Sequence, residues 1–251
     1  MRLKHDLGRL PVSRITFLGT GDFLASERYW NGFVIDGRVL VEPSPTVLPH
    51  LRRCGFRASE LEVVVVSHFH ADHTFGWPFL LLELVRSKRQ SPISVVGPPG
   101  IETYLGEMME LGGVGVVRRM AAEQLDIRYL EVDGAWQVAG PIRFQAVEVD
   151  HVPYLRCFGF VFELDGRAIG YSGDTRPCPG LDTLAARCDV LVLECNGPHP
   201  PPQTHMYVAD VVALRERFPD PRLILTHLGA GVNPFNIENC TVPRDFETIT
   251  V

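Results

Sequence analysis

The sequence predicts a mixed α/β fold, and three observations predict it. Short apolar, β-rich runs alternate with helical patterns along the whole chain. The second half of the chain repeats this alternation, and no linker of biased composition separates the halves. The chain has 251 residues, of which 45% are hydrophobic and 22% are charged, and this is enough for a core of ordinary size. We therefore expect residues 1–251 to form a single domain of two similar halves, roughly 1–125 and 126–251.

The first half begins with short strands and a helix. Strands are expected at residues 14–18, 32–36 and 38–41, the last two joined by a turn at Asp36 and Gly37. Pro45 suits the start of a helix and Gly55 its end, so a helix is expected at residues 45–54. Four consecutive valines indicate that residues 61–67 form a strand buried on both faces. Helices at 77–89 and 98–112 and strands at 93–96 and 127–132 follow.

The second half continues the pattern. Residues 142–149 alternate between apolar and polar side chains, which is typical of a half-buried strand. Residues 158–164 and 168–171 are predicted to form a hairpin around Asp165 and Gly166. Buried strands are expected at 190–194 and 223–226, separated by a helix at 208–218 that stops at Pro219.

Composition excludes several classes of protein. The net charge is −6, so the chain has no overall basic field that would hold a long nucleic acid. No segment approaches the ~18 uninterrupted apolar residues of a membrane span, and the first residues lack the apolar core of a signal peptide. We therefore expect a cytoplasmic protein with no membrane partner. The six cysteines include no Cys-x-x-Cys pair and are interpreted as ordinary thiols.

The densest chemical signal is the segment HFHADH at residues 68–73, directly after the valine strand. Imidazole nitrogens and a carboxylate suit a borderline divalent ion such as Zn²⁺, and three protein ligands with an open position are typical of a catalytic site. In an irregular or incipient helical turn, His68 and His70 can point to one side while Asp72 and His73 serve a second ion. The alternative interpretation is a polar loop with surface histidines.

Three more residues of metal-binding type follow predicted strands. His151 comes after the strand at 142–149, Asp174 after the one at 168–171, and His227 after the one at 223–226. Ligand sites in α/β folds gather outside the carboxyl ends of strands, so these residues can converge on one cleft. Each alone has a simpler explanation, such as a core histidine or a turn aspartate. Their conjunction with the 68–73 segment favours a metal site.

The order of these residues resembles the metallo-β-lactamase superfamily of αββα hydrolases. The 68–73 segment, His151, the SGDT at 172–175 and His227 occur in that family's order, and the flanking strands extend the resemblance over nearly the whole chain. The resemblance implies a four-layer αββα sandwich that binds two divalent ions, zinc or manganese. It implies that His68, His70 and His151 bind the first ion, that Asp72, His73 and His227 bind the second, and that Asp174 bridges both.

Further details resemble the phosphodiesterase branch, which includes the tRNA 3′ processing endonucleases (the RNase Z group) and the phosphoribosyl cyclic phosphodiesterase. These details are FLGTG at 17–21, the spacing from His151 to FGF at 158–160, YSGDTRP at 171–177, and Glu194 followed by His205. The resemblance implies that His205, oriented by Glu194, protonates the leaving oxygen. The usual His-Ser-Thr is His-Met-Tyr here, and the alternative is a helix-cap histidine beside a buried strand-end glutamate.

The resemblance implies a binuclear hydrolase with a metal-bridging hydroxide as nucleophile. Two divalent ions lower the pKa of a shared water towards about 7. Asp72 would orient the hydroxide or accept its proton, and the expected substrate is a small or nucleotide-like phosphodiester. The same hydroxide attacks polarised carbonyls, so hydrolysis of thioesters or lactones stays open. A metal-stabilised binding module without turnover is the non-enzymatic alternative.

The second hypothesis is a tRNA 3′ processing endonuclease. The RNase Z group clasps tRNA with an inserted flexible arm, and residues 97–151 contain no long Gly-rich or Lys-rich insertion. Together with the acidic net charge, this disfavours folded tRNA as a partner. The resemblance alone also allows a homodimer.

Three features near the expected site have open interpretations. Residues 19–21 form either a close-approach loop under the site or a plain turn. Arg28, Trp30 and Arg176 are either substrate contacts or ordinary surface packing. The Pro-rich loop at 197–202 is either a rigid rim that shapes access or a connector.

Overall fold

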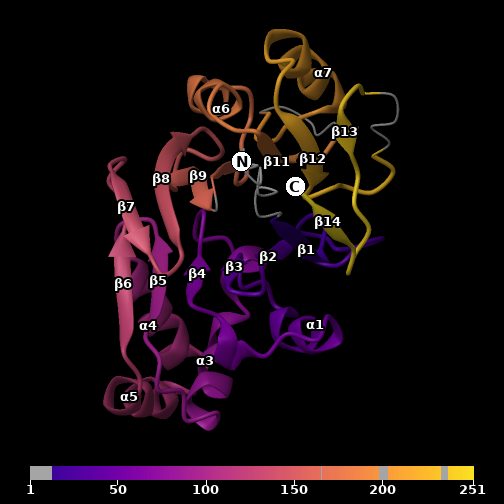
Figure 1. Ribbon diagram of the computed structural model, residues 1–251. Helices are drawn as coiled ribbons and strands as arrows, with labels where there is room; N and C mark the ends of the chain where they lie inside the picture. The colour runs from indigo at the N-terminus through magenta and orange to yellow at the C-terminus, as the bar shows by residue number, and fades with distance from the viewer. Residues whose placement is uncertain (1–12, 165, 198–202, 233–236) are drawn as a thin grey trace, which may run out of the picture.

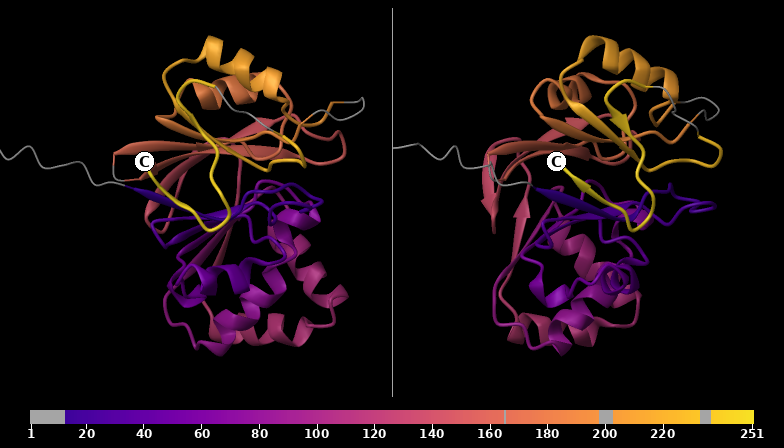
Figure 2. Two further views of the ribbon diagram at one scale, coloured as in Figure 1. Left: turned by 90° about the vertical axis from the view of Figure 1, so that its right-hand side faces the viewer. Right: turned by 45° about the vertical axis from the view of Figure 1, so that its right-hand side comes forward.

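Two β-sheets stack face to face and form the centre of the molecule (Figure 1). The computed structural model describes residues 13–164, 166–197, 203–232 and 237–251. One seven-stranded sheet has the order β14-β1-β2-β3-β4-β5-β6 and the other has the order β13-β12-β11-β10-β9-β8-β7. Figure 2 shows helices covering the outer face of each sheet. The predicted α/β class and its four-layer αββα arrangement are confirmed.

The first sheet is built from the first half of the chain and closed by its last strand. Its strands are β1 (Arg14–Gly19), β2 (Gly32–Ile35), β3 (Val39–Val41), β4 (Val63–Val65), β5 (Ile93–Gly97), β6 (Ile127–Glu131) and β14 (Thr248–Thr250). The helical segments associated with it are α1 (Val47–Arg53), η1 (Ala58–Glu60), α2 (Ala71–Thr74), α3 (Trp77–Arg86), α4 (Ile101–Leu111) and α5 (Gly115–Gln124).

The second sheet is built from the second half of the chain. Its strands are β7 (Trp136–Ala139), β8 (Ile142–Val149), β9 (Cys157–Leu164), β10 (Arg167–Tyr171), β11 (Val190–Glu194), β12 (Arg222–Thr226) and β13 (Cys240–Thr241). Helices α6 (Pro179–Ala185) and α7 (Val208–Arg217) pack on its outer face (Figures 1 and 2).

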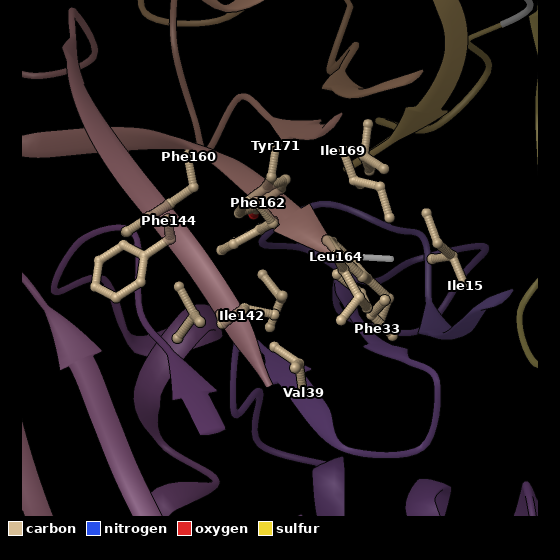
Figure 3. Close-up of a cluster of buried hydrophobic side chains, with 14 of the residues drawn as sticks. Ile15, Phe33, Val39, Ile142, Phe144, Phe160, Phe162, Leu164, Ile169 and Tyr171 are labelled. Atoms are coloured by element: carbon tan, nitrogen blue, oxygen red, sulfur yellow. The ribbon is translucent and has the colours of Figure 1, made fainter. Parts of the chain in front are cut away.

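The space between the sheets is filled by a buried apolar core. Phe33 and Val39 of the first sheet pack in it with Phe162 and Leu164 of the second, as Figure 3 shows. Two further apolar clusters lie between each sheet and its helices. Because burial of apolar area is the main driving force of folding, these three layers of core hold the four layers of the sandwich together.

The valine run illustrates how strand period places side chains in two cores. Val63 and Val65 belong to the core between the sheets, whereas Val64 and Val66 belong to the core under the helices. Successive side chains of a strand point to opposite faces, so a strand covered on both faces must be apolar at every position. The prediction of a strand buried on both faces is confirmed, although β4 itself covers Val63–Val65 only.

Strand direction brings several chain segments to one edge of the sandwich. Strands β3, β4, β5 and β6 are parallel to one another, and so are β10, β11, β12 and β13. Strand β8 runs in the same direction as β10, because β9 is antiparallel to both. The carboxyl ends of β8, β10, β11 and β12 therefore lie at the same edge of the second sheet.

Helix α3 ends earlier than the helix predicted at residues 77–89. The helix ends at Arg86, and Lys88 has a φ of 52°, which is incompatible with continuing the helix. Arg89 is buried and donates hydrogen bonds to the backbone carbonyls of Ser59, Ser91 and Pro92. It therefore fastens neighbouring loops instead of forming a charged surface.

The described residues also bear on the predictions about membrane-spanning segments and about the cysteines. None of the helices in these ranges combines the length and the apolar character that a membrane crossing requires. The six cysteines are free thiols, and burial raises the pKa of Cys157, Cys188 and Cys195 to about 12. Buried thiols of such high pKa are unreactive.

Candidate metal centre

The 68–73 segment lies where the chain leaves β4. His70 has extended backbone angles, φ −71° and ψ 153°, and the single helical turn α2 starts immediately after it. This change of backbone conformation divides the side chains into two sets. His68 and His70 join one cluster, and Asp72 and His73 join a second.

The first cluster brings three imidazoles to one point. His68 Nε2 is 3.0 Å from His70 Nδ1, and His151 Nε2 is 3.3 Å from the same atom. Asp174 Oδ2 lies 3.8 Å from His68 Nε2 and 3.9 Å from His151 Nε2. A tetrahedral ion with bonds of about 2.0–2.1 Å to nitrogen requires ligand atoms about 3.3 Å apart. The spacing of the three imidazole nitrogens therefore fits a bound ion.

The second cluster has a similar spacing. Asp72 Oδ2 is 3.2 Å from His73 Nε2 and 3.3 Å from His227 Nε2. Asp174 Oδ2 is 3.4 Å from each of the same two nitrogens. One carboxylate oxygen of Asp174 thus lies within 4 Å of imidazole nitrogens in both clusters, which is the position that a bridging ligand requires.

Buried polar atoms in both clusters lack hydrogen-bond partners. Among the described residues, Asp72 Oδ1, Asp174 Oδ1 and both ring nitrogens of His73 have no hydrogen-bond partner. A buried polar group left unsatisfied costs about 1–3 kcal/mol, so a ligand that these atoms could bind would offset that cost. Nitrogen and carboxylate donors are the ligands that divalent ions such as Zn²⁺ accept. The residues present therefore fit a divalent metal.

The electrostatics of the second cluster attract positive charge. Burial alone lowers the pKa of His73, but the carboxylates of Asp72, Asp174 and Glu42 outweigh it and raise this pKa well above its ordinary value. Burial likewise opposes ionisation of Asp72, yet His73 and His227 hold its pKa below the usual range. A group of ionised carboxylates in a buried site favours a cation.

The first cluster instead keeps its imidazoles neutral. Burial is the main cause that lowers the pKa of His68 well below its ordinary value and that of His151 to about 4. Neutral imidazole is the form that binds metal. His151 Nδ1 donates a hydrogen bond of 2.8 Å to Thr204 O, and this leaves Nε2 as the acceptor that faces the cluster.

Glu42 is a functional candidate that the sequence analysis missed. It follows β3, is fully buried, and accepts hydrogen bonds from the Ser67 N–H at 3.2 and 3.3 Å. Its Oε1 is 3.4 Å from His73 Nδ1. An acidic residue shortly after a buried strand is the signal that identified Asp174, and Glu42 directly follows β3, so this position could have been found.

His205, which is partly exposed, and the buried Glu194 form a pair beside the clusters. His205 Nδ1 lies 3.0 and 3.2 Å from the two carboxylate oxygens of Glu194, which is the last residue of β11. Burial disfavours a charged His205, but the Glu194 carboxylate outweighs it and raises the pKa of His205 to about 9. The helix-cap alternative for His205 is wrong, because Tyr207 is the N-cap of α7.

Members of both clusters and His205 line one cavity. Its volume is about 230 Å³. Its walls are Phe23, His70, Asp72, His151, Val152, Asp174, Thr204, His205 and His227. His227 has a φ of 52°, a left-handed conformation that non-glycine residues rarely adopt and that is concentrated at functional sites.

The structure bears on the glycine loop at residues 19–21, on two of the candidate substrate contacts and on the Pro-rich loop. A Cβ on Gly19 would lie 2.1 Å from Trp30 O, so the close approach at residues 19–21 is to the chain's own backbone. Arg28 donates to Thr20 Oγ1 and Pro243 O, and Arg176 pairs with Asp150 at 2.7 Å. Both arginines therefore make structural contacts. In the Pro-rich loop, residues 198–202 lie outside the described residues.

The fold and the site together define a class of protein. It is a four-layer αββα protein whose strand ends hold two groups of His and Asp side chains that fit divalent ions. Residues 37–228 match the family described as the beta-lactamase superfamily domain. Because this match covers most of the chain, the chain belongs to the beta-lactamase superfamily.

Curated relatives and solved structures agree with this assignment. Ribonuclease Z of Mycobacterium marinum is 29% identical over 192 residues, which are 71% of this chain and 68% of that protein. A second ribonuclease Z, from Mycobacterium bovis, is 28% identical over 163 residues, which are 61% of this chain and 58% of that protein. In both cases the chain spans only part of the relative's length.

Two solved structures share the fold. The short form of human tRNase Z has a TM-score of 0.75 and 22% identity, covering 94% of this chain and 98% of that one. A diphosphatase from the PhnP family has a TM-score of 0.73 and 18% identity, covering 97% of this chain and 98% of that one. The family and these relatives define the chain as a metal-dependent hydrolase.

Proposed function

We propose that this hydrolase is a phosphodiesterase that acts on a small or nucleotide-like diester with two divalent ions, most simply zinc. The observation that carries the proposal is the position of Asp174 Oδ2, within 4 Å of imidazole nitrogens of both clusters. A single carboxylate shared by two ligand sets supports a binuclear centre. The neighbouring His205–Glu194 pair supplies a proton donor in the same cavity.

Seven side chains would hold the two ions. His68, His70 and His151 would bind the first ion, Asp72, His73 and His227 the second, and Asp174 both. When bound, such a pair of ions supplies an activated water and neutralises the negative charge of a phosphodiester.

Asp72 and His205 would handle protons. The Asp72 carboxylate lines the cavity and is ionised, so it can orient a water and accept a proton from it. His205 carries a proton at neutral pH because of Glu194, and it can give that proton to the departing alkoxide. Glu194 also accepts a hydrogen bond of 2.6 Å from the Thr175 N–H, which fixes the carboxylate beneath His205.

The cavity and the surrounding chain support a small substrate. A volume of about 230 Å³ lies below the range of about 300–1,000 Å³ for pockets of drug-sized ligands, which favours a small substrate. Residues 98–150 are all described and are occupied by α4, α5, β6, β7 and β8 with short connections, so this segment forms compact structure instead of an extended arm. The net charge of −6 also disfavours a long polyanion.

A tRNA 3′ processing endonuclease is the second candidate. The names of the relatives favour it, because the mycobacterial proteins are ribonuclease Z and the human structure is a tRNase Z. Cleavage of a precursor tRNA by the metal-loaded protein, with binding that persists at ~150 mM salt, would support this candidate over the first.

A side-by-side substrate screen tests the proposal. The zinc- or manganese-loaded protein is assayed on bis(p-nitrophenyl) phosphate, a thioester and a lactone, with the Asp174→Ala variant as the blank. We expect hydrolysis of the phosphodiester and its loss in the variant. Opening of the thioester or the lactone with no turnover of the phosphodiester would contradict the proposed reaction class.

A further inference from the structure

An exposed aromatic ring lies at the mouth of the cavity. Phe23 forms part of the cavity wall together with Asp72, His151, Asp174 and other side chains of the site. Its side chain is nevertheless 60% exposed. A single exposed phenylalanine is ordinary on a protein surface. Its place in the wall of this cavity is what calls for an explanation.

The backbone on both sides of Phe23 is fastened to the site. The Asp22 N–H donates a hydrogen bond of 3.2 Å to the carbonyl of Leu228, the residue that follows His227. Asp22 Oδ1 in turn accepts hydrogen bonds from the N–H groups of Leu24 and Ala25 at 3.1 and 3.2 Å. The position of Phe23 is thus tied, through Asp22 and Leu228, to the residue next to the candidate metal ligand His227.

A second set of contacts holds the carbonyl of Phe23 and the base of its loop. The indole Nε1 of Trp30 donates a hydrogen bond of 2.8 Å to Phe23 O. The Gly21 N–H donates to Tyr29 O at 2.7 Å, and a Cβ on Gly21 would lie only 2.8 Å from Arg28 O. These contacts involve backbone atoms and neighbours of Phe23, so they fix its position without using its ring.

The ring itself stays available to a ligand. Among the aromatic contacts within the described ranges, none involves Phe23, whereas Tyr29 packs against His50 and Phe246. Tyr154 is a second exposed ring near the site, but its hydroxyl faces His70 Nε2 at 3.5 Å and its side chain is not part of the described cavity wall. An exposed flat apolar ring whose backbone is anchored beside the cavity is suited to stack on another flat ring.

We propose that Phe23 is a specificity-determining residue that stacks on a planar ring of the substrate, such as a nucleobase, while the phosphate occupies the cavity. This inference rests on the proposed phosphodiesterase function and narrows its substrate class to esters that carry a flat ring. Base–aromatic stacking is tolerant of base identity, because every base presents a π-face. We therefore expect a preference for ring-bearing over ring-free phosphates with little discrimination among bases.

The affinities of two phosphate monoesters, measured in separate titrations, test the inference. Thymidine 5′-monophosphate carries a ring and ribose 5-phosphate does not, and both are titrated calorimetrically into the zinc-loaded protein. We expect the Phe23→Ala variant to bind the nucleotide on the order of 10-fold more weakly and to bind ribose 5-phosphate as the wild type does. Phe23→Trp, which keeps a flat face, retains the preference. Leu24→Ala, an exposed neighbour in the same loop, changes neither affinity.

The outcomes separate this inference from the proposed function. Equal affinity of the wild type for the two monoesters overturns the role of Phe23, and so does a nucleotide preference that survives in Phe23→Ala. An equal loss of affinity for both ligands in Phe23→Ala also overturns it, because that result indicates a general disturbance of the cavity. Failure of the proposed function appears in a different measurement, as absence of bis(p-nitrophenyl) phosphate turnover by the wild type.

Discussion

At the scale of single residues, the candidate site depends on buried charged side chains that hold one another in position. Asp174 is the clearest case, because its Oδ2 lies within 4 Å of ring nitrogens of four histidines. Its pKa is held well below the usual range, chiefly by His227 and His73 against the effect of burial. Glu42 is a second fully buried carboxylate, and its Oε1 lies 3.4 Å from His73 Nδ1. Such a carboxylate fixes the orientation of a ligand imidazole and increases its basicity.

Glu42→Gln tests this role. The substitution keeps the size of the side chain and removes the negative charge beside His73 Nδ1. We expect zinc affinity at the second cluster to fall about 10- to 100-fold, as measured by competition with a chromophoric chelator, while the first cluster retains its affinity. Glu62→Gln, which alters a surface carboxylate paired with Arg38, is the matched control. Unchanged zinc affinity in Glu42→Gln would contradict the assignment.

His50 provides a pH-dependent prediction away from the metal centre. It is buried between the rings of Tyr29 and Phe246, at 4.5 and 5.0 Å between centroids. Burial lowers its pKa below the ordinary 6.5, against the opposing effect of Asp245. The unfolded chain therefore binds the proton first as the pH falls. The stability that neutral His50 contributes is complete above pH 6.5 and is lost as the pH falls below that value.

His50→Gln removes this titration. Between about pH 7.5 and about pH 5.5, we expect the melting temperature of the wild type to fall more than that of the variant, because the other histidines are common to both proteins. Thermal melts of the two proteins in matched buffers measure the difference. Parallel pH profiles would show that His50 does not titrate differently in the folded and unfolded states.

At the scale of elements, the ends of strands place the site and short connections aim the side chains. His68 follows β4, His151 follows β8, Asp174 follows β10 and His227 follows β12. The α2 turn adds Asp72 and His73 before the chain enters α3. The junction between α2 and α3 is therefore a structural support of the second cluster.

Gly76 is the tightest point of that junction. A Cβ there would lie 2.0 Å from Ser44 O and 2.6 Å from Val47 Cγ1, closer than real atoms approach. We expect Gly76→Ala to displace the start of α3 and to lower the free energy of unfolding by about 1–3 kcal/mol in urea titrations. Gly112→Ala, where the nearest neighbour would lie 3.1 Å away, should cost less. An unfolding midpoint equal to that of the wild type would show that the junction tolerates a side chain.

Some strands and helices could be predicted from the sequence and others could not. Long apolar or alternating strands such as β8, β11 and β12 could be predicted, because burial dictates their side-chain pattern. The strands β7, β13 and β14 and the helices α5 and α6 were missed. Strand β13 has two residues and β14 three, and such short strands form through pairing with an existing sheet edge, which leaves little local signal.

At the scale of the whole molecule, the sandwich converts distant sequence positions into one cavity. The candidate ligands run from His68 to His227, and the sequence indicated their residue types and their order because ligand chemistry is local. The support from Glu42 and the presentation of Phe23 arise from contacts between loops far apart in sequence. Leu228 holding Asp22 is such a contact, and no pattern within either segment predicts it.

Metal should stabilise the folded molecule as a whole. Binding to the folded state alone adds about 2.7 kcal/mol when the free metal concentration is 100 times its dissociation constant. For a chain of this length, each kcal/mol corresponds to about 2–4 °C of melting temperature. We expect zinc to raise the melting temperature of metal-stripped protein by about 5–10 °C, measured by scanning calorimetry. The Asp174→Ala variant should show a smaller shift, and identical shifts in both proteins would place the metal elsewhere.

Anomalous X-ray diffraction at the zinc absorption edge, on crystals grown with excess zinc, tests the central claim most directly. We expect two peaks, one among His68, His70, His151 and Asp174 and one among Asp72, His73, His227 and the same Asp174. A map with no peak inside this cavity, or with zinc bound only to other surface groups, would contradict the binuclear centre and the chemistry built on it.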